Sequence, residues 1–254
     1  MFDRPRIIPV LLIDNKKLVK TKQFNHPNYL GDPINAVKIF NEKMADELCI
    51  LDISRNRKDI DYEYLHDIAT EAFMPLSYGG GINNLEQIKK LFKLGFEKVV
   101  INSSLVTNPE LIRQAAEYAG SQSIVASIDV KRTLFHNKSC YIKNGSINSK
   151  YSPVELALKA EKLGAGEILL NSIDRDGMMN GYDLELIREI SRSLKIPLIV
   201  CGGAGNLVDV KTAIDIGVQA VAAGSIFVYY GAKKAVLINY PSEEELVKNG
   251  IFYS

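Results

Sequence analysis

The chain has 254 residues, of which 46% are hydrophobic and 24% are charged, and its formal net charge is +1. This composition is typical of a globular protein, and the near-neutral charge excludes broad attraction to nucleic acid or to an anionic membrane. The apolar runs are too short to cross a bilayer, and residues 1–6 show no signal-peptide core. Three separate cysteines without a CxxC pair and three scattered histidines predict no disulfide, metal or cofactor and a reducing, cytoplasmic location.

Short apolar segments alternate with amphipathic segments along the chain. The predicted strands are Arg6–Ile13, Glu47–Ile53, Pro75–Tyr78, Lys98–Asn102, Ser123–Asp129, Glu167–Asn171, Pro197–Cys201 and Ala220–Ala223. The predicted helices are Pro33–Lys43, Tyr62–Glu71, Leu85–Leu94, Pro109–Ala119, Pro153–Leu163, Tyr182–Leu194, Leu207–Ile216 and Ser242–Lys248. The strands are too apolar to leave one face in water. The alternation predicts one α/β domain over residues 1–254, a closed parallel (β/α)8 TIM barrel, with an open doubly wound sheet as the alternative.

An internal repeat divides this barrel. The segment Gly80–Leu85 matches Gly202–Leu207 at an offset of 122 residues, and three further pairs share that offset: Gly95 with Gly217, Val99 with Val221, and Ser103 with Ser225. The barrel is therefore predicted to consist of two half-barrel repeats in tandem.

Two insertions follow predicted strands. Lys16–Gly31 is expected to be a long mobile loop, and Lys131–Ser152 contains Phe135–Ser139, which is expected to form the turn of a small hairpin. Both insertions come after the carboxyl end of a strand, which is the end where barrels of this type carry their active sites.

Glycine-rich turns follow the third and seventh strands, and Asn-Ser and Gly-Ser pairs follow the fourth and eighth. Glycine lets backbone N–H groups approach a phosphate closely. Two such turns, on opposite sides of one mouth, predict sites for a ligand that carries two phosphates. The alternative is that they are only tight turns required for barrel closure.

Carboxylates follow the fifth and sixth strands. Asp129 ends the fifth strand, where a general acid or base would be needed, although a loop-bracing aspartate would occupy the same position. After the sixth strand, the sequence Asp174-Arg175-Asp176-Gly177 adds two more, one of which is expected to bind ligand or to position the loop.

Several motifs resemble the cyclase subunit (HisF) family of imidazole glycerol phosphate synthase across nearly the whole chain: Arg6–Pro9, Gly31–Pro33, Ala45–Leu48, Gly79–Ile82, Gly164–Leu170, Ser172–Gly177 and Gly181–Asp183. The resemblance implies a (β/α)8 barrel that works with a glutaminase subunit bound at its amino-terminal face. Ammonia from the glutaminase would pass through the barrel to the opposite face. There the family cyclises a bis-phosphorylated substrate.

The resemblance also implies site residues. The family uses two catalytic aspartates, and the second matches Asp129, but Leu12 stands where the first should be. Asp14 lies two residues further on, roughly 6–7 Å along a strand, and would substitute for this acid only with a shifted backbone. Residues matching the family's phosphate and substrate contacts are Lys20, Gly81, Asn102, Ser103, Asp176, Gly177, Gly203, Gly224 and Ser225.

Charged residues open four of the predicted strands, where side chains face the bottom of a closed barrel. The resemblance implies that they form a gate for ammonia, whereas their chemistry alone also allows a purely structural ring of ion pairs: Arg6, Glu47, Lys98 and Glu167.

All four residues that match the ammonia gate are present, whereas the first catalytic aspartate is absent. This combination predicts a paralogue that delivers ammonia rather than cyclising its own substrate. Relatives of this kind accompany the amidation of sugars in surface polysaccharides, which implies a third, sugar-amidating enzyme as a partner. The alternatives are an ordinary histidine-pathway cyclase with a relocated acid, a related sugar-phosphate isomerase, and a pure binding module. Because the isomerase family also uses paired aspartates, Leu12 counts equally against that reading.

Overall fold

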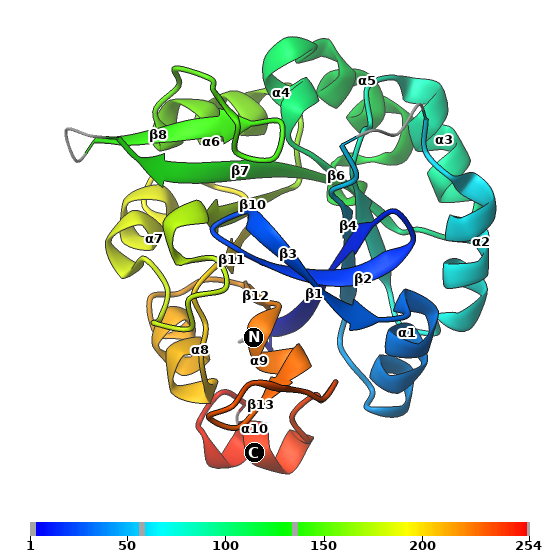
Figure 1. The fold of residues 1–254 in the computed structure, drawn as a ribbon. Helices are drawn as coiled ribbons and strands as arrows, with labels where there is room; N and C mark the ends of the chain where they lie inside the picture. The colour runs from blue at the N-terminus through cyan, green and yellow to red at the C-terminus, as the bar shows by residue number, and fades with distance from the viewer. Residues whose placement is uncertain (1–3, 56–58, 134–136, 253–254) are drawn as a thin grey trace.

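The computed structural model describes residues 4–55, 59–133 and 137–252. Eight parallel strands form a closed barrel, since each strand pairs with the next and the last pairs with the first (Figure 1). In barrel order these strands are β1 (Arg6–Asp14), β4 (Leu48–Asp52), β5 (Leu76–Gly79), β6 (Lys98–Ile101), β7 (Ile124–Arg132), β10 (Glu167–Ser172), β11 (Leu198–Cys201) and β12 (Ala220–Ala223). The predicted barrel is confirmed, and the open sheet is excluded.

Helices surround the barrel on its outer face (Figure 1). They are α1 (Pro33–Glu42), α2 (Tyr62–Glu71), α3 (Leu85–Lys93), α5 (Glu110–Ala119), α6 (Pro153–Leu163), α7 (Leu184–Ser191), α8 (Leu207–Ile214) and α10 (Glu243–Lys248), with the short α4 (Ser103–Thr107) and α9 (Ser225–Val228). Side-chain caps define several starts. Asp32 accepts from the Asn35 N–H before Pro33, and Ser152 forms a capping box with Glu155.

The core has two separate layers. The large outer layer lies between strands and helices and includes Phe40 and Tyr78, both fully buried. The inner layer fills the barrel with alternate residues of the strands: Ile8, Val10, Cys49, Val100, Val125, Leu169, Ile199, Cys201, Ala220 and Ala222. Side chains alternate between these layers because successive residues of a strand point to opposite faces.

Both insertions fold into antiparallel strands. The Lys16–Gly31 segment is a hairpin of β2 (Lys17–Lys22) and β3 (Asn25–Gly31) that continues from β1, so it contains strands rather than a loop alone, and its mobility stays a prediction. The second insertion contains β8 (Lys138–Ile142), which pairs with β7, and β9 (Ile147–Asn148). Strand β7 runs to Arg132, and Lys138 and Ser139 already belong to β8, while residues 134–136 of the predicted turn lie outside the described residues.

The repeat is visible in the local backbone. Asn84 and Asn206, at matching positions, cap α3 and α8 in the same way, and Ser103 and Ser225 both begin short helices. The strand β13 (Tyr229–Tyr230) pairs with β14 (Ala235–Val236) after α9, an addition that the strand pattern did not predict. Among the described residues, no helix is long and apolar enough to cross a membrane.

Candidate functional site

A ring of four charged side chains closes the lower, amino-terminal end of the barrel. Arg6 donates to Glu47 Oε2 and Glu167 Oε1, each at 2.6 Å. Lys98 Nζ donates to the same two acids, to Glu47 Oε2 and to Glu167 Oε2, each at 3.0 Å. Each base therefore bridges both acids, and the four charges cancel. The structure brings together all the residues predicted for this ring.

The ring is largely withdrawn from water. The side chains of Glu47 and Glu167 are 4% and 11% exposed, and Lys98 is 16% exposed. Burial disfavours the charged form of Arg6, but Glu167 and Glu47 outweigh this, so its pKa is raised above the ordinary value. Glu47 precedes β4 rather than opening it, yet its side chain still reaches into the barrel.

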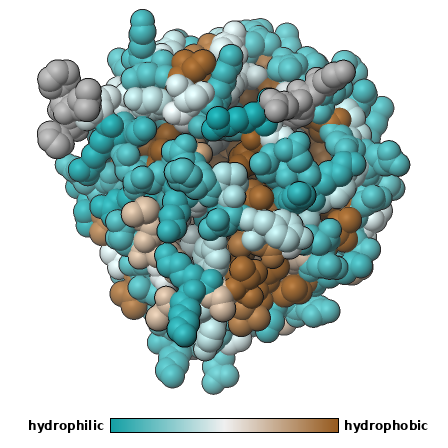
Figure 2. Space-filling model, in the orientation of Figure 1, coloured by the Kyte–Doolittle hydropathy of each residue, from teal (hydrophilic) through white to brown (hydrophobic). Residues whose placement is uncertain are grey.

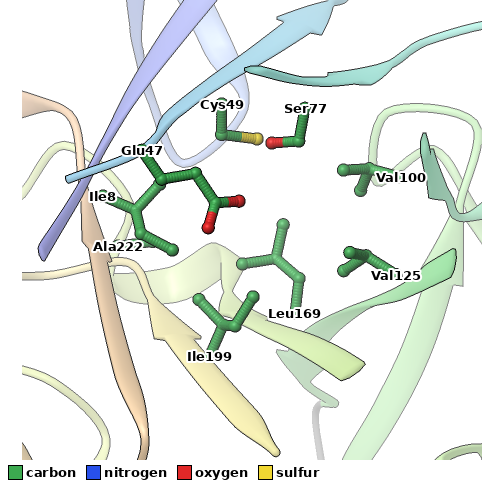
Figure 3. Close-up of a pocket in the computed structure, with 9 residues that line it drawn as sticks. All are labelled: Ile8, Glu47, Cys49, Ser77, Val100, Val125, Leu169, Ile199 and Ala222. Atoms are coloured by element: carbon green, nitrogen blue, oxygen red, sulfur yellow. The ribbon is translucent and has the colours of Figure 1, made fainter. Parts of the chain in front are cut away.

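A small apolar cavity lies inside the barrel above the ring. It has room for about one water-sized molecule, and Figure 3 shows Glu47 pointing into it. Its other lining residues are Ile8, Cys49, Ser77, Val100, Val125, Leu169, Ile199 and Ala222. Cys49 and Ser77 interact through their side chains, and burial raises the pKa of the Cys49 thiol to about 12, so this thiol is inert rather than nucleophilic.

Asp129 lies at the upper end of the barrel. It is 8% exposed, and burial raises its pKa to about 7, with Asp176 adding to the shift and a hydrogen bond from Ser127 opposing it. A carboxyl group with this pKa exchanges protons near neutral pH, which suits acid–base chemistry.

Near the end of β1, Leu12 provides an aliphatic side chain and no carboxyl group. It pairs with Leu51 across β1 and β4, and both leucines pack against the inner core. Asp14 sits beyond them, at the tight turn into β2, where it pairs with Lys17 and accepts from Asn15 Nδ2 at 2.8 Å. The structure thus places Asp14 at the root of the hairpin rather than in the position of the missing acid.

Lys20 and Asp176 form a buried pair across the mouth of the barrel. Lys20 Nζ is 2.7 Å from Asp176 Oδ1, and Thr21 Oγ1 donates to the other carboxylate oxygen at 2.9 Å. These contacts hold the β2–β3 hairpin against the turn after β10, and the Gln23 N–H adds a backbone bond to Asp176 at 2.9 Å. Figure 1 shows the hairpin crossing the mouth.

The glycine positions of the second half-barrel are closely packed. Gly177 and Gly203 have φ of +71° and +115°, and a Cβ at either would meet a backbone oxygen within 2.3 Å, from Thr21 and Gly181 respectively. A Cβ on Gly224 would lie 3.1 Å from Lys20 Cε. Close packing and positive φ therefore require glycine at Gly177 and Gly203, whatever they bind.

The corresponding positions of the first half-barrel lie near the β8–β9 turn. Gly81 is exposed with φ of +69°, and Asn102 donates to the Ser127 carbonyl oxygen at 3.1 Å. Ser103 Oγ accepts from the Lys143 N–H at 3.1 Å.

The sequence analysis did not identify three residues of the candidate site: Thr21, Asn171 and Lys143. Asn171 pairs with Asp129 and with Cys201 on the two neighbouring strands, and its buried Oδ1 lacks a hydrogen-bond partner among the described residues. The position of Asn171, at the end of its predicted strand, was the available signal. Within the described ranges no cluster of three His, Cys, Asp or Glu side chains is suited to a metal ion.

Comparisons with known proteins agree with this geometry. A family model described as "Histidine biosynthesis protein" matches residues 6–234. A protein of Leptospira interrogans, provisionally named imidazole glycerol phosphate synthase subunit HisF, is 50% identical over 98% of this chain and 99% of its own length. A Pseudomonas aeruginosa protein, provisionally named subunit hisF2 of the same synthase, is 48% identical over 96% and 98%. The HisF subunit of Dictyoglomus turgidum is 43% identical over 87% and 89%. The chain therefore belongs to the HisF family of histidine biosynthesis proteins.

Proposed function

We propose that this chain is the barrel subunit of a glutamine amidotransferase complex and that it delivers ammonia rather than cyclising a substrate. A glutaminase docks at the lower end of the barrel, ammonia enters through the ring of four charges, and a phosphorylated ligand binds at the upper end. A third enzyme consumes the ammonia to amidate a sugar of a surface polysaccharide.

One observation carries this proposal: the ring at the entrance is complete, whereas Leu12 occupies the place of an acid at the exit. A lost acid commonly reduces acid–base catalysis by a factor of about 10²–10⁴.

The chemistry of the lumen favours ammonia in its neutral form. Beyond the Glu47 carboxylate, the cavity above the ring is lined mainly by aliphatic side chains, which disfavour a charged ammonium ion more than a neutral molecule of that size. The Ser77 hydroxyl is a polar contact within this lining, and a small molecule with N–H donors would bond to it in passing.

The second candidate is a working cyclase of histidine biosynthesis. The raised pKa of Asp129 favours it, because one carboxyl group is poised to exchange protons near neutral pH. The position of Asp14 counts against it, since this carboxylate is held at the β1–β2 turn.

Cyclase turnover at saturating ammonium tests the proposal, because free ammonium removes the need for a glutaminase. We expect no turnover by the native chain, with the Dictyoglomus turgidum HisF relative as the active control in the same substrate preparation. Turnover by the native chain that disappears in Asp129→Asn would contradict the proposal and establish the cyclase.

Glutaminase docking is tested separately. We expect the native chain to copurify with a glutaminase and to increase glutamine hydrolysis. If the chain neither binds nor activates a glutaminase, ammonia delivery is wrong, whatever the cyclase assay shows.

A further inference from the structure

The aspartate beside the ring of four charges holds the backbone of β1. Asp46 directly precedes Glu47, and its Oδ2 accepts from the Ile7 N–H at 3.0 Å. Its other carboxylate oxygen, Oδ1, accepts from Arg4 Nη2 at 3.1 Å. Ile7 in turn directly follows Arg6, a member of the ring. One carboxylate therefore connects the chain beside Glu47 to the chain beside Arg6.

The Tyr240 hydroxyl group completes this connection. Its oxygen lies 3.0 Å from the Ile7 carbonyl oxygen and 3.2 Å from Asp46 Oδ2, so its one proton is shared between two acceptors. The Asp46 N–H donates to the same hydroxyl oxygen at 3.5 Å. Burial and the charge of Asp46 raise the pKa of Tyr240, so the hydroxyl group stays protonated and remains a donor.

These contacts take the place of strand pairing at the level of the four charges. The pairing of β1 with β4 begins at Val10 and Cys49, which lie above the ring. The N–H and carbonyl groups of Ile7 lie below that point, and Asp46 and Tyr240 bond to them there. Removing the hydroxyl group would therefore take a hydrogen bond from the backbone next to the ring.

Aromatic packing fixes the position of the Tyr240 side chain. Tyr240 is 5% exposed and lies against Phe40 of α1 and Phe227 of α9, with aromatic centroids 6.5 and 5.6 Å away. Figure 2 shows apolar side chains gathered between α1 and α9. A phenylalanine would bury the same aromatic surface, so what the hydroxyl group adds is the hydrogen bonding.

The carboxyl-terminal segment, residues 240–252, also holds Arg4. Arg4 Cζ lies 3.8 Å from the centroid of the Phe252 side chain, and Arg4 Nη1 lies 3.6 Å from Glu243 Oε1 of α10. Phe252 is 4% exposed, which anchors the end of this segment in the core. The segment thus reaches Asp46 in two ways, directly through Tyr240 and indirectly through Arg4.

We propose that Tyr240 is a positioning residue for the ring of four charges. Its hydroxyl group, together with Asp46, aligns the start of β1 with the start of β4, so that Arg6 bridges both acids. The proposal rests on the proposed function, because it gives the carboxyl-terminal segment a part in aligning the entrance for ammonia. A tyrosine that only filled the core would not influence the contacts of Arg6.

NMR spectra of the full chain test this role through the Arg6 Nε–H signal, which is identified by its absence in Arg6→Lys. Tyr240→Phe removes only the hydroxyl group. We expect the Arg6 signal to shift and its exchange with water to accelerate about tenfold, as the loss of one hydrogen bond would allow. The matched control is Tyr182→Phe, because Tyr182 is 3% exposed and its hydroxyl group donates to the Ala222 carbonyl oxygen at 3.0 Å. That variant should leave the Arg6 signal unchanged.

Asp46→Asn serves if Tyr240→Phe fails to fold, because it keeps the shape of the side chain, removes its charge and should shift the same signal. An Arg6 signal that stays native in the folded variant, or that shifts equally in Tyr182→Phe, would overturn the proposal. The measurement needs no glutaminase. A chain that neither binds nor activates a glutaminase would therefore overturn ammonia delivery, while the Arg6 signal still decides the role of Tyr240.

Discussion

The two ends of the barrel lumen differ in how their charges are balanced. At the lower end, two bases and two acids share four ion pairs within 2.6–3.0 Å. At the upper end, burial raises the pKa of Asp129, and the nearby charge of Asp176 raises it further. Buried charges persist when they are paired, and an unpaired carboxyl group binds a proton instead. The comparison shows four fully paired charges at the lower end and, at the upper end, a buried carboxyl group whose pKa is raised.

Removing one acid from the ring of four charges should have the largest effect on stability. Glu47→Ala leaves Arg6 and Lys98 short of a partner, so we expect the free energy of unfolding to fall by about 3–5 kcal/mol. Removing Lys98 as well should recover part of this loss, because Arg6 and Glu167 then remain as a balanced pair. Urea denaturation measures both changes.

The control for this variant is Glu86→Ala, whose carboxylate pairs with Lys89 but is 73% exposed. We expect that change to cost less than about 1 kcal/mol. Equal losses in Glu47→Ala and Glu86→Ala would show that the ring contributes no more than a surface ion pair.

The raised pKa of Asp129 at the upper end should make the free energy of unfolding depend on pH. Because the pKa of Asp129 is about 7 in the folded chain, above its ordinary 3.8, the folded state holds this proton more tightly than the unfolded chain does. Stability from this group therefore falls as pH rises between these values, by at most about 1.4 kcal/mol per pH unit. Asp129→Asn should remove that slope, so the variant gains about 2–3 kcal/mol relative to the native chain from about pH 5 to pH 7.

Unfolding measured at several pH values gives this difference. Ser127→Ala sharpens the test, since it removes the hydrogen bond that opposes the shift and should move the transition to higher pH. A native-minus-variant difference that does not change with pH would mean that Asp129 is not an isolated buried acid.

The contact between the two insertions at Gly145 should have the smallest effect on the free energy of unfolding. Gly145 and Gly217 both have positive φ, but an added Cβ meets Phe24 and Ile173 at Gly145 and open space at Gly217. We expect Gly145→Ala to cost about 1 kcal/mol more than Gly217→Ala, because only the first adds crowding to the backbone strain. Thermal or urea unfolding of both variants measures the difference, and Phe24→Ala should reduce it. Equal costs would show that the two insertions do not pack together there.

Several features followed from local pattern alone. The alternation of apolar strands and amphipathic helices predicted the barrel, and the predicted helix starts at Pro33 and Pro153 coincide with the starts of α1 and α6. The charges of the entrance ring could be placed at one end because each one lies at or next to the start of a strand, and parallel strands align their starts.

Other features depended on the insertions. The sequence pattern predicts a loop at the β2–β3 hairpin because its polar residues mask the alternation of a strand, and the hairpin forms by pairing with β1. The length of β7 was underestimated for the same reason, since Lys131 and Arg132 are exposed and stay in the strand by pairing with β8.

The sequence by itself determined the barrel, the repeat and the ring residues, because these follow from residue type and periodic spacing. Its resemblance to the family identified the missing acid at Leu12. Only the tertiary structure decided that the Lys143 N–H donates to Ser103 Oγ, while Ser225 Oγ has no hydrogen-bond partner within the described part of the chain. Ser103 and Lys143 are 40 residues apart and meet through the packing of two insertions, so no local pattern encodes their contact. The raised pKa of Asp129 is likewise tertiary, because it arises from burial and from a carboxylate contributed by another strand's loop.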